Sequence, residues 1–132
     1  MIGLDTNVLV RYLVQDDPLQ SKRATAQIEK AMHAQESLFL NHIVLCELVW
    51  VLMRAYRYPK STVLDVLEKI MLTEQFEIES KDVVWSAIND YKIDKADFSD
   101  ALIGVKNHLA GCRTTLTFDN AAGSLLSFSN IH

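Results

Sequence analysis

Two acidic residues close short apolar segments that have the character of strands. Asp5 ends the segment IGLD at 2–5, and Asp119 ends the segment TTLTFD at 114–119. In an open parallel sheet the ligand site lies at the carboxyl ends of the strands, so both carboxylates are expected where such a site would form. An acid at the end of a strand is also a common turn or cap residue. Finding two of them favours a shared site over two unrelated turns.

A second pair of acids lies in the segment ADFSDALIG, where Asp97 and Asp100 are three residues apart. This spacing places both side chains on one face of the first turn of a helix. Helix capping is an alternative interpretation, with Asp97 as the N-cap and Asp100 as an acid that the positive end of the helix favours. Capping would explain this pair without any function.

Glu47 stands in the middle of an apolar run, HIVLCELVWVLM at 42–53. With Leu45, Leu48 and Val49 around it, the residue is expected to be buried, and a buried carboxylate needs a partner. A salt bridge, a raised pKa with a neutral side chain, and a bound cation each remain open for Glu47 taken alone. Helix capping does not account for it, since it lies five residues into the predicted helix.

The acids taken together favour a divalent cation. Two carboxylates 4 Å apart repel by about 4 kcal/mol at an effective dielectric constant near 20, so several in one pocket require a countercharge. A ligand set made of oxygen atoms suits Mg²⁺ or Mn²⁺ and does not suit zinc or copper. The two cysteines have no C-x-x-C spacing and the four histidines show no zinc-binding spacing, which agrees with that choice.

Strands and helices alternate along the whole chain. The pattern predicts strands at 2–5, 37–41, 76–80, 114–119 and 125–129, and helices at 7–13, 18–34, 42–58, 60–72, 81–93 and 96–111. Such alternation predicts an α/β fold, a doubly wound sheet of about five mostly parallel strands with helices on both faces. We expect residues 1–132 to form a single domain, because no linker or repeat interrupts the pattern.

Composition limits the possible functions. Of the 132 residues 49% are hydrophobic and 23% are charged, as in ordinary globular domains. No apolar stretch reaches the ~20 residues that span a bilayer, and the N-terminus lacks the features of a secretory signal, so we expect a cytoplasmic protein. The net charge of −4 provides no overall attraction to nucleic acid, which would therefore need a local basic patch. Residues 54–60, RAYRYPK, are one candidate, although cations also gather at helix C-termini for structural reasons.

Four motifs in order, LDTNVL, VLCELVWVL, ADFSDALI and TFD, resemble those of the PIN-domain ribonucleases. Within that family the sequence is similar to the VapC-type toxins of bacterial and archaeal toxin–antitoxin pairs, over essentially all of the chain. The resemblance implies a metal-dependent endoribonuclease that uses Mg²⁺ or Mn²⁺. It also implies a catalytic and metal-binding quartet, with a further acid common in this subgroup at Asp97. The quartet consists of Asp5, Glu47, Asp100 and Asp119.

Three polar residues beside these acids also match the family pattern. Thr6 and Asn7 follow the first acid, and Thr117 lies two residues before the last one. Their structural alternatives stay open, since Thr6 and Asn7 would also cap a helix and Thr117 would also suit a strand.

The segment after the last acid, FDNAAGS, lacks the basic residues that often follow it in relatives. RNA phosphates would then have to contact cations elsewhere, such as Arg11, Lys22, Arg23 and the 54–60 segment.

The resemblance further implies an RNA substrate, a cognate antitoxin that blocks the acids, and a homodimer or a higher assembly with the antitoxin. Two other classes of protein are alternatives. One is a non-catalytic binding module on the same scaffold, which would be expected to have lost acids from the pocket. The other is a different magnesium-dependent phosphotransfer or phosphatase-like protein, whose D-x-D or late-lysine patterns the LDTN and TFD motifs do not fit.

Overall fold

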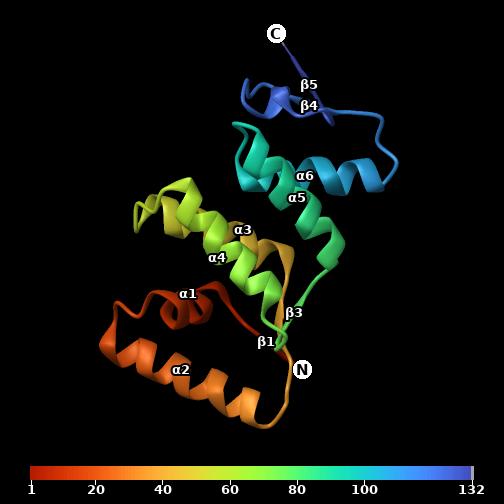
Figure 1. Ribbon diagram of the computed structural model, residues 1–132. Helices are drawn as coiled ribbons and strands as arrows, with labels where there is room; N and C mark the ends of the chain where they lie inside the picture. The colour runs from red at the N-terminus through yellow and green to blue at the C-terminus, as the bar shows by residue number, and fades with distance from the viewer. Residues whose placement is uncertain (132) are drawn as a thin grey trace. The chain divides into compact units, whose positions relative to one another are not determined.

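The computed structural model describes residues 1–131, and its contacts divide the chain into two compact units, Met1–Glu79 and Ser80–His132. Each unit is α/β with parallel strands, which confirms the predicted class. The five expected strands are all present, but they pair as one sheet of three and one sheet of two (Figure 1). None of the described helices is long and apolar enough to cross a membrane.

The first unit is built on a sheet with the strand order β1-β2-β3. Both pairs are parallel, with Ile2 opposite Leu38 and Leu38 opposite Phe76. Two helices connect each strand to the next, which provides the long crossover connection that parallel strands need. The elements, in chain order, are β1 (Ile2–Gly3), α1 (Thr6–Val14), α2 (Pro18–His33), β2 (Leu38–Leu40), α3 (His42–Arg54), α4 (Lys60–Leu72) and β3 (Phe76–Ile78).

Local signals position these helices. Asp17 is the N-cap of α2, where its carboxylate accepts a hydrogen bond from the backbone N–H of Gln20 at 2.9 Å, and Pro18 occupies the first helical position. The apolar faces of the helices and strands then form one core. Its most buried members are Leu9, Ile28, Leu38, Leu40, Leu45, Leu48, Leu52, Val63, Leu67 and Ile70.

Helix α3 is shorter than its sequence suggests. The sequence predicts a helix that continues to the residue before Pro59, but α3 ends at Arg54. The backbone N–H groups of Tyr56 and Tyr58 turn back to the carbonyls of Val51 and Leu52, at 3.3 and 2.9 Å. These bonds satisfy carbonyls that a longer helix would have used, so the chain leaves the helix one turn early.

The second unit has two adjacent helices and a sheet of two parallel strands. Thr115 of β4 pairs with Phe128 of β5, so the last strand begins three residues later than predicted. The elements are α5 (Lys81–Ile93), α6 (Phe98–Leu109), β4 (Thr115–Thr117), the 3-10 turn η1 (Ala122–Ser124) and β5 (Phe128–Asn130). Gly111 follows α6 with φ +100°, the left-handed conformation expected of a glycine that ends a helix.

Gly104 is where α6 packs against the last strand, and we expect Gly104→Ala to destabilise the protein. A Cβ atom there would lie 2.6 Å from Cε2 of Phe128 and would also meet the Ser127 hydroxyl. The expected cost is about 1–3 kcal/mol of overpacking, offset in part by up to about 1 kcal/mol from the better helix propensity of alanine. Chemical denaturation measures the difference. Gly3→Ala is the control, since a Cβ at Gly3 meets nothing within 4 Å; equal stability of the two variants would contradict the packing argument.

Candidate active site

Asp5 lies where β1 gives way to α1. Its backbone is extended, with φ −79° and ψ 156°, which makes it the N-cap of α1. One carboxylate oxygen, Oδ1, accepts a hydrogen bond from the backbone N–H of Thr6 at 2.8 Å. The helix thereby fixes the orientation of the carboxylate, and the side chain remains exposed.

Thr6 joins this aspartate to the glutamate of α3. The threonine is buried, with 6% of its surface exposed, and its hydroxyl donates to Oε1 of Glu47 at 2.8 Å. One residue therefore contacts both carboxylates, through its backbone N–H on one side and its hydroxyl on the other. We call Asp5, Thr6 and Glu47 the first acidic cluster.

The expectation that Glu47 is buried is wrong, because its side chain is exposed. At 3.6 residues per turn, Leu45, Leu48 and Leu52 face the core while Glu47 lies on the other side of the helix. That other side also carries apolar residues, including the exposed Trp50. The run looked uniformly buried in the sequence because both faces of α3 are apolar.

No cation of the described residues neutralises the first acidic cluster. Ion pairs within residues 1–131 include those of the N-terminal amine with Glu36, Arg11 with Asp16 and His42 with Glu79, and none of these involves Asp5 or Glu47. The salt-bridge explanation for Glu47 therefore finds no support within residues 1–131. Two carboxylates that are linked through one threonine and lack a countercharge are chemically suited to an oxygen-binding cation.

The second unit holds the other acids of the predicted site. Asp97 is the N-cap of α6 by its backbone angles, but its side chain makes no capping hydrogen bond. Burial raises the pKa of the Asp100 carboxyl above its ordinary value, and the nearby charges of Asp97 and Asp119 raise it further. A hydrogen bond from the Asp97 backbone acts in the opposite direction but is the smallest of these effects. The surroundings of Asp100 therefore disfavour its negative charge.

Asp119 is held by a tight turn. Its Oδ1 accepts from the backbone N–H groups of Ala121 and Ala122, at 2.8 and 3.0 Å, and its own N–H donates to the Thr117 hydroxyl at 3.0 Å. Thr117 therefore orients the turn that carries the acid. We call Asp97, Asp100 and Asp119 the second acidic cluster, because the charges of Asp97 and Asp119 both act on Asp100.

The two clusters belong to different units, and the structure describes each by itself. Within residues 1–131 no group of three or more histidine, cysteine, aspartate or glutamate side chains is arranged to hold a metal ion. Of the other predicted site residues, Asn7 is exposed on α1 and lines a groove between α1 and α2.

Comparison with known proteins identifies the class of protein. Residues 2–124 match the family model of the PIN domain, so the chain belongs to the PIN-domain family. It is also 30% identical over 117 residues to a VapC ribonuclease of Aquifex aeolicus (strain VF5). That alignment covers 87% of this chain and 84% of the relative. None of the solved structures matches the chain.

Proposed function

We propose that this protein is a Mg²⁺- or Mn²⁺-dependent endoribonuclease that hydrolyses RNA phosphodiester bonds. The observation that carries the proposal is the first acidic cluster, in which Thr6 links Asp5 to Glu47 and no Lys or Arg of residues 1–131 pairs with either. A cation at this cluster would remove the repulsion between the carboxylates. The VapC ribonuclease that matches most of the chain supports the same activity.

We propose further that the chain is a single PIN domain whose metal-binding quartet is Asp5, Glu47, Asp100 and Asp119. The family model spans residues 2–124 and therefore both units. Asp5 follows β1 and Asp119 follows β4, and the carboxyl ends of parallel strands are where sites form in such sheets. Asp5 and Asp100 are the proposed direct ligands, with Glu47 and Asp119 completing the set or positioning the water.

The donor set fits the proposed ion, because all four side chains offer carboxylate oxygens and these suit Mg²⁺ and Mn²⁺. When bound, the ion would supply a more acidic water and a countercharge for the phosphate. The protein's own contribution is orientation. Thr6 holds Glu47, the α1 N-terminus holds Asp5, and Thr117 with the 119–122 turn holds Asp119.

The likeness to a VapC ribonuclease also supports a cellular role. We propose that the protein is the toxin of a type II toxin–antitoxin pair, that a cognate antitoxin covers the acids, and that it works in the cytoplasm as a homodimer or a larger assembly with that antitoxin.

The direct test is cleavage of labelled structured RNAs by the purified protein, with and without divalent metal. We expect cleavage with Mg²⁺ or Mn²⁺, no cleavage after treatment with EDTA, and recovery when metal is added in excess. Because contaminating ribonucleases such as the pancreatic type need no metal, activity that survives EDTA does not count as support. Metal-replete protein that cuts none of the RNAs would contradict the proposal.

We expect Thr6→Val to lower the rate of cleavage by about 10- to 100-fold, the range found when a residue that orients a metal ligand is lost. Valine has nearly the same shape as threonine, so the buried site stays filled, but the hydroxyl that donates to Glu47 is gone. Thr6→Ser is the matched control, because it keeps the hydroxyl and should restore most of the activity. The apparent affinity for Mg²⁺ should fall in the valine variant alone; equal behaviour of the two variants would exclude the hydrogen bond as the cause.

A further inference from the structure

Glu47 belongs to a row of exposed side chains along α3. Ile43, Glu47, Trp50 and Arg54 follow one another at spacings of four, three and four residues, so they lie on one side of the helix. All four are exposed, Ile43 with 70% and Trp50 with 61% of its surface. We call these four residues the α3 stripe. It combines a carboxylate, an aromatic ring and a guanidinium group on one helix.

Trp50 is the neighbour of Glu47 in this stripe. Residues three apart on a helix have Cβ atoms about 5–6 Å apart, so the indole borders the carboxylate that the Thr6 hydroxyl orients. Within residues 1–131 the indole neither pairs with another ring nor forms a hydrogen bond. In the first unit, a flat aromatic face is therefore available to a ligand beside a proposed metal ligand.

Arg54 adds a cation one turn after Trp50. Its side chain is exposed and forms no ion pair with any residue of 1–131. Arg11 differs in this respect, because its Nη1 already contacts Asp16 at 3.1 Å. At a rise of 1.5 Å per residue, Arg54 lies about 10 Å from Glu47 along the helix axis. The charge of Arg54 is therefore available on the same face as the proposed metal ligand.

We propose that Trp50 stacks on an unpaired base of the RNA next to the bond to be cut, and that Arg54 contacts a phosphate beyond that base. The inference rests on the proposed function, since both residues are located relative to Glu47. Proteins bind single-stranded RNA by stacking bases on aromatic side chains and by pairing cations with the backbone. Only an unpaired base exposes its face, so the substrate class is single-stranded RNA or the loops of a folded RNA.

A protein partner is the alternative occupant of an exposed tryptophan. Charged side chains flank Trp50 on both sides, because Glu47 precedes it and Arg54 follows it. A dry protein interface would bury both charges, and charged residues are depleted at the core of such interfaces. A permanent partner on Trp50 would also cover Glu47, which the proposed reaction needs open to metal and substrate. The α3 stripe therefore favours a substrate over a second copy of the chain.

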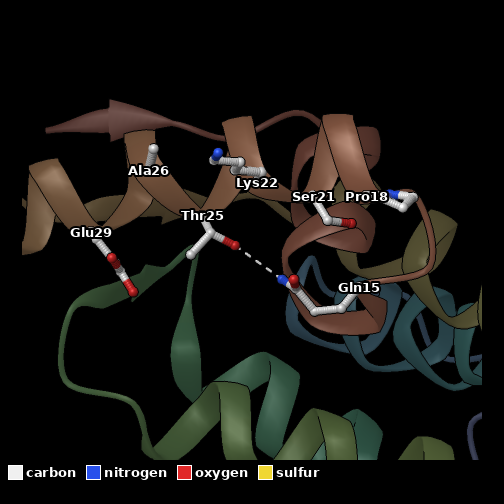
Figure 2. A pocket seen from close by; sticks show the side chains of 7 residues that line it. All are labelled: Gln15, Pro18, Ser21, Lys22, Thr25, Ala26 and Glu29. Atoms are coloured by element: carbon white, nitrogen blue, oxygen red, sulfur yellow. Dashed lines mark hydrogen bonds between the residues drawn. The ribbon is translucent and has the colours of Figure 1, made fainter.

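The hollow beside α2 lacks this combination and provides a control. Figure 2 shows its lining, in which Gln15 donates a hydrogen bond to the Thr25 hydroxyl at 3.0 Å. Lys22 brings a positive charge to this hollow, but Glu29 brings a negative one and no aromatic side chain lines it. Lys22→Gln thus removes an exposed positive charge away from any ring.

Tryptophan fluorescence tests the stacking directly, because the chain has two tryptophans, Trp50 and the half-buried Trp85 of α5. The full chain in an Asp5→Asn background, with Mg²⁺ present, is titrated with an unstructured 12-nucleotide RNA. We expect saturable quenching in the Trp85→Phe variant, whose only tryptophan is Trp50. The Trp50→Phe variant, which keeps Trp85, should lose this quenching.

Binding of the same RNA, carrying a fluorescent label, measures the contributions of both residues in that background. We expect Trp50→Leu to weaken binding by roughly tenfold, within the range for loss of one base–aromatic stack, and Trp50→Phe to retain most of the affinity. Arg54→Gln should reduce the slope of log affinity against log salt by about 0.7, the value for one phosphate contact on a single strand. Lys22→Gln should leave this slope nearly unchanged.

Quenching confined to Trp85, or unchanged RNA binding by folded Trp50→Leu protein, would overturn the proposal. Sedimentation of the same variant identifies the alternative occupant. A dimer that becomes a monomer in Trp50→Leu, with RNA binding intact, would overturn the proposal and assign the α3 stripe to a second copy. The proposed nuclease activity is judged separately, by metal-dependent cleavage with the unsubstituted protein, so a failure of the stacking is distinguishable from a failure of the function.

Discussion

Replacing Asp5 with asparagine is expected to abolish RNA cleavage while the protein remains folded. The proposed metal contributes several kcal/mol to stabilising the charge that develops in the reaction. Loss of about 4 kcal/mol corresponds to about a thousandfold in rate, because each 1.36 kcal/mol is a factor of ten. The measurement is the initial rate of cleavage with saturating Mg²⁺, together with the thermal unfolding temperature of the same preparation.

The fold should tolerate this change because Asp5 also has a structural task that asparagine can perform. Its Oδ1 accepts the hydrogen bond from the Thr6 backbone N–H, and asparagine and aspartate are about equally good N-caps. Asp17→Asn is the matched control. It makes the same substitution at the N-cap of the next helix, outside both acidic clusters, and should leave the activity unchanged. Normal cleavage by folded Asp5→Asn protein would refute the assignment of the site.

Asp100→Asn is expected to have two opposite effects, a loss of cleavage and a gain in the stability of the metal-free protein at neutral pH. Burial is the largest of the causes that raise the pKa of Asp100, followed by the charges of Asp97 and Asp119. Its negative charge therefore destabilises the metal-free fold, and asparagine removes that charge. Cleavage should fall by more than the 10- to 100-fold typical of residues that contact a metal ligand indirectly.

The pH dependence follows from the direction of this pKa shift. A carboxyl whose pKa is higher in the folded than in the unfolded state contributes stability below the unfolded pKa, about 3.9 for aspartate. That contribution is lost as the pH rises through the higher, folded value. The advantage of Asp100→Asn over the unsubstituted protein should thus grow from pH 4 toward pH 7. Added Mg²⁺ should raise the unfolding temperature of the unsubstituted protein and leave that of the variant nearly unchanged, because only the former binds the ion.

Asp82 provides the control for this variant. It is also an acid in the first turn of a helix, and it is exposed. Asp82→Asn should cost a few tenths of a kcal/mol or more, since it loses a favourable interaction with the helix dipole. The two substitutions are therefore expected to change stability in opposite directions. If Asp100→Asn destabilised the metal-free protein as Asp82→Asn does, Asp100 would be a helix-terminal acid of the ordinary kind.

Elements that depend on local signals could be predicted from the sequence. The bounds of α4 and α5 agree with the prediction at both ends, because apolar spacing and flanking polar residues define them locally. The end of α3 could not be placed, since the bonds from Tyr56 and Tyr58 to earlier carbonyls depend on a backbone turn in which Arg57 adopts φ 55°. Left-handed conformations at residues other than glycine leave no reliable signature in a sequence.

The candidate acids could be listed from the sequence, but their surroundings could not. The sequence pattern alone does not show which face of α3 is covered. It predicts a buried Glu47, whereas the side chain is exposed. The contacts among Arg11, Asp16 and Tyr56 were not foreseen either, because Tyr56 is 45 residues from Arg11 and no spacing rule connects them. The four motifs could be recognised in the sequence because each of them spans only a few neighbouring residues.

The sequence by itself determined the family, the α/β class, the helices with strong local signals and the identity of the acids. Each of these depends on side chains that are near one another along the chain. Only the tertiary structure decided that the Thr6 hydroxyl donates to Glu47 from 41 residues away, and that Arg11 donates to the hydroxyl of Tyr56 from 45 residues away. Such contacts arise when separate helices pack, and packing depends on the combined shape of many side chains, which no short motif contains.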